Sequence, residues 1–164
     1  MNVEGYVEAI FIGPDQGGSL GEVEAVAAVA GEGLEGDRKH IDALPPRKRG
    51  EPGRNLTLIE AEALEALAEE HGIELGPGEA RRQIYTRGIR LNPLVGKRFT
   101  VGDVECVGVE LCEPCAHLQS LTPPGTMRGL VHRGGLRADI LTSGTIRTGD
   151  PVREVTDRAE ATAS

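Results

Sequence analysis

The chain has 164 residues and a formal net charge of −8, and 38 % of its residues are hydrophobic. This length is enough for one domain with a proper core. No apolar run reaches transmembrane length and the N-terminus has no signal-peptide pattern, so we expect neither a membrane-spanning nor a secreted protein. The acidic charge argues against nonspecific nucleic-acid binding.

Composition also indicates the fold class. Aromatic residues make up only 2 % of the chain, so the core must consist of Val, Leu, Ile and Ala. The 23 glycines and 10 prolines favour a turn-rich all-β barrel over a helix bundle. Three cysteines are an odd number and too few for a disulfide framework, so we expect a cytoplasmic protein with free thiols.

In chain order, residues 3–12 and 23–29 are rich in β-branched or alternating apolar residues and predict two strands. Three closely spaced glycines follow, and then Asp37, Arg38 and His40. No Gly-Lys-Ser/Thr comes after them, so this is not a phosphate-binding loop. Two interpretations remain open: a plain turn with a surface ion pair, which spacing alone favours, or a loop that presents these three side chains.

A short strand at residues 55–59 leads into the clearest helix of the sequence. Leu64, Leu67 and Ala68 fall at helical spacing within residues 60–71, and Gly72 suits the helix C-terminus. The remaining strands are predicted at 81–88, 94–99, 101–111, 133–141 and 145–155, with Gly-Asp turns at 102–103 and 149–150. Because no linker interrupts the pattern, residues 1–155 are predicted to form a single domain, followed by a frayed polar tail at 156–164.

Cys115 has the setting that most suggests chemistry. Pro114 has a fixed φ and no N–H, which suits the first position of a short helix. Cys115 would then lie in the first helical turn, where free N–H groups and the helix dipole favour a thiolate. A thiolate can act as a nucleophile, a soft-metal ligand or a sulfur carrier. His117 can orient or deprotonate a nearby group, or can simply lie on the surface.

The other cysteines match no familiar cysteine site. A thioredoxin-type pair of Cys112 and Cys115 requires a βαβ unit, which the predicted elements do not include. Zinc and iron–sulfur sites normally require four ligands. Cys106 is mid-strand and Cys112 is at a strand end, so both are interpreted as small buried residues. The CxxC spacing also permits a reversible disulfide.

Charge is unevenly distributed along the chain. Residues 81–137 carry nine Lys/Arg against four Asp/Glu and contain all three cysteines. The positive balance of this segment indicates an anionic ligand near Cys115. The alternative is that the acidic residues are concentrated on helix faces elsewhere in the chain, and that the middle of the chain has no special role.

An ordered set of motifs resembles the MOSC domain family, named for the C-terminal domain of molybdenum-cofactor sulfurases. No single motif is specific, but together they span about residues 3–155 in the family's order. The motifs lie at 33–40 (GLEGDRKH), 55–60 (NLTLIE), 81–88 (RRQIYTRG), 94–96 (LVG), 99–103 (FTVGD), 114–115 (PC), 133–138 (RGGLRA), 144–146 (GTI) and 149–152 (GDPV).

The resemblance implies a compact stand-alone member of the family with a closed, mostly antiparallel β-barrel and a few short helices. It implies that Cys115 ligates molybdenum or carries a persulfide. It also implies that the stretch Arg81-Arg82-Gln83 contacts the phosphate side of the pterin, with Arg38, Arg81, Gln83 and Thr86 as the molybdopterin-binding residues beside that cysteine. Members usually have an asparagine where this chain has Gln83. Guanidinium groups bind phosphate in a bidentate manner, which agrees with the basic segment.

Two functions follow from the resemblance. The first is a molybdenum-cofactor oxidoreductase that reduces N-hydroxylated small molecules, with Cys115 as the catalytic thiolate. The chain has no dinucleotide fingerprint and no iron–sulfur ligand set, so a separate electron-transfer protein must supply electrons. The second is a sulfur carrier without turnover, which receives a Cys115 persulfide from a cysteine desulfurase. For the oxidoreductase we expect a basic docking surface formed by Arg81, Arg87, Arg128, Arg133 and Arg137.

Overall fold

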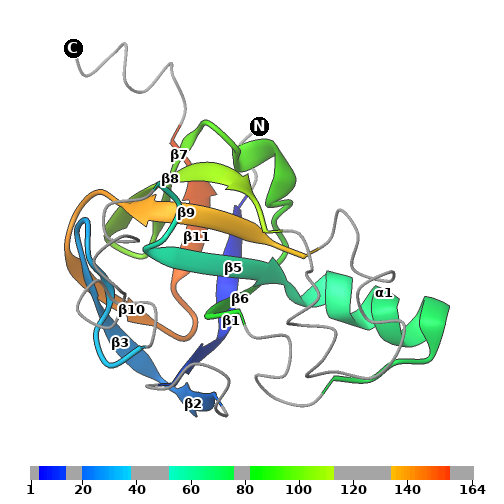
Figure 1. Cartoon of the computed structure of the whole chain (residues 1–164). Helices are drawn as coiled ribbons and strands as arrows, with labels where there is room; N and C mark the ends of the chain where they lie inside the picture. The colour runs from blue at the N-terminus through cyan, green and yellow to red at the C-terminus, as the bar shows by residue number, and fades with distance from the viewer. Residues whose placement is uncertain (1–3, 14–19, 38–51, 76–81, 113–133, 156–164) are drawn as a thin grey trace.

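The computed structural model describes residues 4–13, 20–37, 52–75, 82–112 and 134–155 (Figure 1). Its elements are the strands β1 Glu4–Ile12, β2 Gly21–Val23, β3 Ala25–Val29, β4 Gly33–Leu34 and β5 Leu56–Glu60, the helix α1 Ala61–His71, the strand β6 Ile84–Arg87, the 3-10 helix η3 Asn92–Leu94, and the strands β7 Arg98–Val101, β8 Val104–Leu111, β9 Leu136–Ile140, β10 Gly144–Arg147 and β11 Pro151–Glu154.

Seven strands close into a barrel in the order β1-β6-β5-β9-β8-β7-β11, and β11 pairs back with β1. This confirms the predicted mostly-β closed barrel. One pair departs from the antiparallel pattern, because β5 and β6 are parallel. The expectation that the chain contains no βαβ unit is therefore wrong, since α1 connects these two parallel strands. The cysteines lie outside this unit.

The barrel interior is filled with aliphatic side chains. Val7, Leu58, Ile84, Phe99 and Leu136 come from five different strands and are all fully buried in one core. A barrel of this size has an interior only wide enough for its own side chains. A ligand site is therefore expected on the outside of the barrel wall.

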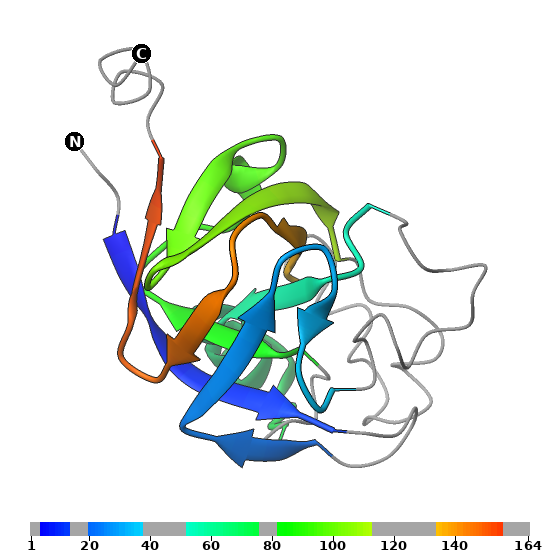
Figure 2. The same cartoon turned by 90° about the vertical axis from the view of Figure 1, so that its left-hand side faces the viewer.

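A smaller sheet, β10-β3-β4, covers one side of the barrel. Val26, Ala28, Leu34 and Ile146 from this sheet join the same core as the barrel strands. Figure 1 shows this sheet and α1 on opposite sides of the barrel, and the turned view of Figure 2 agrees. The side next to α1 is where the outer faces of β5 and β6 lie.

Helix α1 confirms the prediction from helical spacing. Gly72 has φ 66° and donates its N–H to the carbonyl of Ala68, as expected for a glycine just past a helix end. Ala63 packs with Ile59 and Tyr85 on the outer face of the barrel.

The strand predicted at 94–99 is wrong over its first half. The 3-10 helix η3 contains a proline near its start, and β7 begins only at Arg98.

Candidate functional site

Four buried polar residues lie together on the outer side of the barrel wall, and we call them the polar cluster: Asp37, Thr57, Arg82 and Gln83. Their exposed fractions are between 0 and 7 %. Burying such groups is costly unless their hydrogen bonds are satisfied. The bonds they make therefore define how this part of the fold is held.

Gln83 and Thr57 join β5 to the start of β6. The amide Oε1 of Gln83 accepts from the backbone N–H of Thr57 at 2.8 Å and from its hydroxyl at 3.3 Å. The backbone N–H of Gln83 donates to the Thr57 hydroxyl oxygen at 3.0 Å. The Gln83 carbonyl accepts from Phe11 on β1 at 2.7 Å. Gln83 is thus fixed to the two strands on either side of β6.

Asp37 adds a carboxylate to this arrangement. Its Oδ2 accepts from the Gln83 Nε2 at 2.6 Å, and its Oδ1 accepts from the backbone N–H of Gly13 at 3.0 Å. Hydrogen bonds to an ionised carboxylate are stronger than neutral ones. The interpretation of Asp37 as part of a surface ion pair is therefore wrong, because its side chain is only 2 % exposed. Sequence spacing could not show this, since its partner Gln83 is 46 residues away.

Arg82 binds two backbone carbonyls from distant parts of the chain. Its Nε donates to the carbonyl of Gly134 at 2.6 Å and its Nη2 donates to the carbonyl of Cys112 at 3.1 Å. Cys112 follows β8 directly, and Gly134 precedes β9. One buried guanidinium therefore joins the C-terminal end of β8 to the N-terminal end of β9.

Two of the predicted cofactor-binding residues, Gln83 and Thr86, lie within the described residues and point to opposite faces of the barrel wall. Gln83 is on the outer face with the polar cluster. Thr86 follows Ile84 by two residues, so it shares the inward face; its hydroxyl donates to the Ile59 carbonyl at 3.4 Å. Both side chains are fully buried. Their direct contact with a cofactor stays a prediction.

Arg38, Arg81 and Cys115 lie outside the described residues, as do His40 and His117. Arg38, Arg81 and Cys115 are nevertheless each within three positions of a residue that belongs to the polar cluster or is hydrogen-bonded to it. Asp37 precedes Arg38 and Arg82 follows Arg81. Cys112, whose carbonyl Arg82 binds, is three residues before Cys115. The fold thus brings together chain positions next to the predicted site residues.

The other two cysteines have the structural roles expected from the sequence. Cys106 is fully buried in β8 and belongs to the barrel core. Burial, with smaller contributions from the nearby charges of Glu105 and Asp139, raises the pKa of the Cys106 thiol to about 12. This thiol stays protonated at neutral pH and is not a metal-ligand candidate. Cys112 is 5 % exposed.

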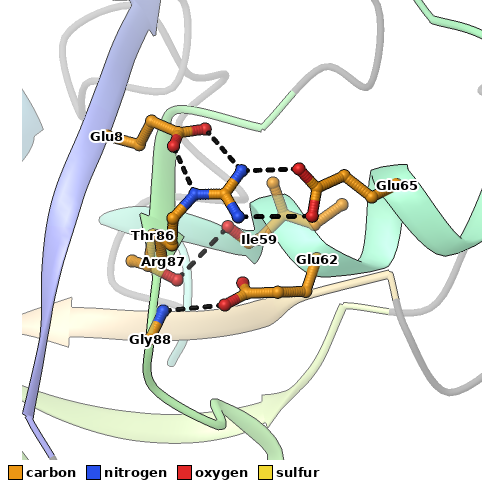
Figure 3. Close-up of polar contacts among 7 residues, drawn as sticks. All are labelled: Glu8, Ile59, Glu62, Glu65, Thr86, Arg87 and Gly88. Carbon is orange, nitrogen blue, oxygen red and sulfur yellow. Dashed lines mark hydrogen bonds and ion pairs between the residues drawn. The ribbon is translucent and has the colours of Figure 1, made fainter.

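Arg87 lies between two carboxylates on the α1 side of the barrel (Figure 3). It donates to Glu65 of α1 at 2.8 Å and to Glu8 of β1. The hydrogen bond that Arg87 donates to Glu65, followed by the one it donates to Glu8, raises the pKa of Arg87. Arg137 also has an acidic neighbour, Glu110, at 3.9 Å. These two members of the predicted basic surface are therefore already paired with carboxylates.

Within the described part of the chain, no three His, Cys, Asp or Glu side chains gather in a way that could hold a metal ion. Searching the same residues finds no helix that is both long and apolar enough to span a membrane. Asp37, Thr57, Arg82 and Gln83 instead form a buried, hydrogen-bonded cluster among described residues that lie close in sequence to Arg38, Arg81 and Cys115.

The fold and the cluster define a class: a closed, mixed β-barrel with a filled interior, whose candidate site is built on the outer side of its wall. The family model of the MOSC domain matches residues 45–153, more than half of the chain. The chain belongs to the MOSC domain family. No curated protein matches the sequence significantly.

Solved structures share this fold at low sequence identity. The YuaD protein from Bacillus subtilis has a TM-score of 0.75 and 15 % identity, over 95 % of this chain and 99 % of that chain. YiiM from Geobacillus stearothermophilus has a TM-score of 0.69 and 16 % identity, over 93 % of this chain and 75 % of that one. YiiM from Escherichia coli has a TM-score of 0.63 and 15 % identity, over 95 % of this chain and 70 % of that one.

Proposed function

We propose that this domain binds the molybdenum cofactor on the outer side of the barrel wall and reduces N-hydroxylated small molecules with electrons from a separate protein. The observation that supports the proposal most directly is the polar cluster. It joins Asp37, Arg82 and the Cys112 carbonyl, which are the described neighbours of Arg38, Arg81 and Cys115. Membership of the MOSC family supports the choice of cofactor.

The donor chemistry of these residues fits the cofactor. A Cys115 thiolate is a soft ligand for a metal that already has sulfur donors. Arg38 and Arg81 would bind the phosphate through their guanidinium groups. When bound, the cofactor supplies the redox chemistry. The chain would orient it: the bond between Gln83 and Asp37 fixes described positions close in sequence to the two arginines, and the filled barrel behind these positions would keep water away from one side.

Molybdenum content tests the proposal. The protein, Cys112→Ala and Cys115→Ser are purified from a host that makes the cofactor, and molybdenum and pterin are measured. We expect the parent and Cys112→Ala to retain both, because Arg82 binds the backbone carbonyl of residue 112 and not its side chain. Cys115→Ser should lose molybdenum. A parent protein free of metal and pterin, which also ignores added cofactor, would reject the proposal.

The same samples test the sulfur-carrier function. After incubation with a cysteine desulfurase, a persulfide adds one sulfur atom to Cys115. A mass increase of about 32 Da on the Cys115 peptide of a molybdenum-free parent would replace the oxidoreductase proposal with the carrier, in agreement with the reactivity of thiolates toward sulfur donors. The adduct should be missing from Cys115→Ser.

A further inference from the structure

We propose that Gln83 and Thr86 clamp the two ends of the parallel β5–β6 ladder, and that they act on the cofactor only as positioning residues, without touching it. The proposal rests on the proposed function for the cofactor itself. It gives two residues of the predicted cofactor-binding set a different role, because their side chains are already engaged inside the protein.

The two residues lie at opposite ends of the ladder, which runs over three residue pairs. Just before the first pair, the Gln83 side chain accepts hydrogen bonds from the N–H and the hydroxyl of Thr57, at 2.8 and 3.3 Å. At the last pair, the Thr86 hydroxyl donates to the Ile59 carbonyl at 3.4 Å. Gln83 makes its bonds on the outer face of the wall and Thr86 on the inner face. β6 is therefore fastened to β5 on both faces.

A parallel ladder gains more from such bonds than a hairpin does. Parallel pairing is slightly less stable per residue than antiparallel pairing, and no tight turn can set its register. Here the two strands are connected through α1 instead. A slip by one residue would exchange the inward and outward faces of β6. Side-chain bonds to β5 at both ends of the ladder oppose that slip.

The Gln83 amide is engaged at both of its ends. Its Oε1 faces the two donors of Thr57, and its Nε2 donates to the Asp37 carboxylate at 2.6 Å. The residue is 0 % exposed, so no surface is left for a ligand. An asparagine, the usual residue of the family here, is one methylene shorter and could not reach both neighbours. The clamp thus explains the glutamine without a ligand.

Thr86 points away from a ligand on the outer side of the wall. It pairs with Val7 of β1 and shares the inward face with Ile84, and both of these belong to the aliphatic core. A buried hydroxyl needs a partner inside the protein, and the Ile59 carbonyl supplies one. A molecule outside the barrel could reach Thr86 only if the wall opened.

Amide hydrogen exchange in the cofactor-free protein tests the clamp. Exchange rates are measured by NMR for the amides of β5 and β6, with β7 and β8 as a reference ladder. The variants are Gln83→Asn, Thr57→Val, the double variant of these two, Thr86→Val and Thr100→Val. The last is the matched control, because it makes the same Thr-to-Val substitution on β7, which does not pair with β5 or β6.

Gln83→Asn and Thr57→Val should each raise the exchange rates of β5 and β6 roughly tenfold, because each loses a buried hydrogen bond. The double variant should differ little from the larger single variant, since both changes remove the same bonds. Thr86→Val should raise the rates about threefold, because its bond is longer. Parent-like β5–β6 rates in Gln83→Asn and Thr57→Val would overturn the clamp. So would an equal rise in β7 and β8, which would indicate general loss of stability.

Cofactor retention distinguishes positioning from direct contact. The same variants are purified from a host that makes the cofactor, and pterin and molybdenum per protein are measured. If Gln83 positions the wall, Gln83→Asn and Thr57→Val should each lose roughly tenfold in retained cofactor, in step with their exchange rates. Contact predicts instead that Gln83→Asn, which restores the usual family residue, retains as much or more, and that Thr57→Val matches the parent. That pattern would overturn the proposal.

The two measurements also separate this proposal from the proposed function. A parent protein without pterin and molybdenum, which also ignores added cofactor, would reject the proposed function. The exchange rates need no cofactor, so they would still decide whether Gln83 and Thr86 clamp the β5–β6 ladder.

Discussion

At the scale of single residues, Gln83 shows how an amide can suit a place where a carboxylate would not. Its Nε2 faces the Asp37 carboxylate at 2.6 Å, while its Oε1 faces two donors of Thr57. An amide has both a donor and an acceptor end, so it satisfies both neighbours at once. This explains why a fully buried glutamine is stable on the barrel wall.

Replacing Gln83 by glutamate should therefore make stability depend on pH. At neutral pH Gln83→Glu sets two carboxylates against each other, and we expect a loss of roughly 2 to 4 kcal/mol in the free energy of unfolding. The folded variant binds a shared proton more tightly than the unfolded chain, so this deficit should shrink as pH falls. Urea unfolding at pH 8 and pH 5 measures the effect.

Gln83→Leu is the control for this prediction. It removes the same hydrogen bonds without adding a charge, so its deficit should shrink less with falling pH than that of Gln83→Glu. Equal deficits for Gln83→Glu at the two pH values would show that Asp37 and residue 83 do not face each other as described.

Among the elements, α1 is fastened to the barrel by charge as well as by packing. Arg87 on β6 binds Glu65 of α1 at 2.8 Å, and Glu62 of the same helix accepts from the Gly88 N–H at 2.8 Å (Figure 3). The hydrogen bond from Arg87 holds the pKa of Glu65 below its ordinary value of 4.5. The pair therefore favours the folded state when Glu65 is ionised.

This gives a prediction about acid stability. A carboxylate with a lowered folded pKa contributes stability above its unfolded pKa, and that contribution is lost as pH falls through the folded value. Between pH 5 and pH 3 the parent should thus lose more stability than Glu65→Gln does. The effect should be small because both side chains are partly exposed. Glu69→Gln on the same helix is the control, and identical acid profiles for the two variants would contradict the prediction.

Two glycines with positive φ allow the cost of backbone strain on substitution to be distinguished from the cost of a steric clash. Gly135 has φ 110° and an added Cβ would lie 2.0 Å from the Leu58 carbonyl oxygen, whereas Gly149 has φ 95° with nothing within 4 Å. Gly149→Ala should cost on the order of 1 to 2 kcal/mol from φ alone. Gly135→Ala should cost about 1 to 3 kcal/mol more, because β5 must move. Thermal or urea unfolding compares them, and equal costs would mean that β5 and β9 approach less closely.

On the scale of the whole molecule, the charges suggest how an electron donor would dock. The basic segment 81–137 lies within an acidic chain. Arg87 and Arg137 are paired with carboxylates, so steering of an acidic partner would depend on the other arginines of the predicted surface, Arg81, Arg128 and Arg133. Association steered by charge is fast and weakens as salt rises.

Turnover by the cofactor-loaded protein should consequently require an added redox protein, and its rate should fall as ionic strength rises. Reduction of a hydroxylamine-type substrate at 50 to 500 mM salt, with a flavin or iron–sulfur donor, is the measurement. A neutral chemical reductant serves as the control, because its rate should change little with salt. Turnover with NADH and no second protein would contradict the prediction.

The sequence by itself determined the features that depend on near neighbours. Periodic apolar residues predict β1 and α1, and Gly72 marks the helix end because its φ of 66° suits glycine. The ordered motifs were enough to identify the MOSC resemblance, which the family match confirms. Each of these signals lies within a short window of the chain, where local geometry restricts the possible structures.

Only the tertiary structure decided which distant residues meet. The parallel pairing of β5 with β6, the bond of Asp37 to Gln83, and the bridge from Arg82 to Cys112 and Gly134 join positions 26 to 52 residues apart. A buried polar side chain bonds to whichever partner the folded chain brings within reach, and no local pattern encodes that partner. For the same reason spacing misread Asp37 as a surface residue and gave no sign that Arg82 binds two distant backbone carbonyls.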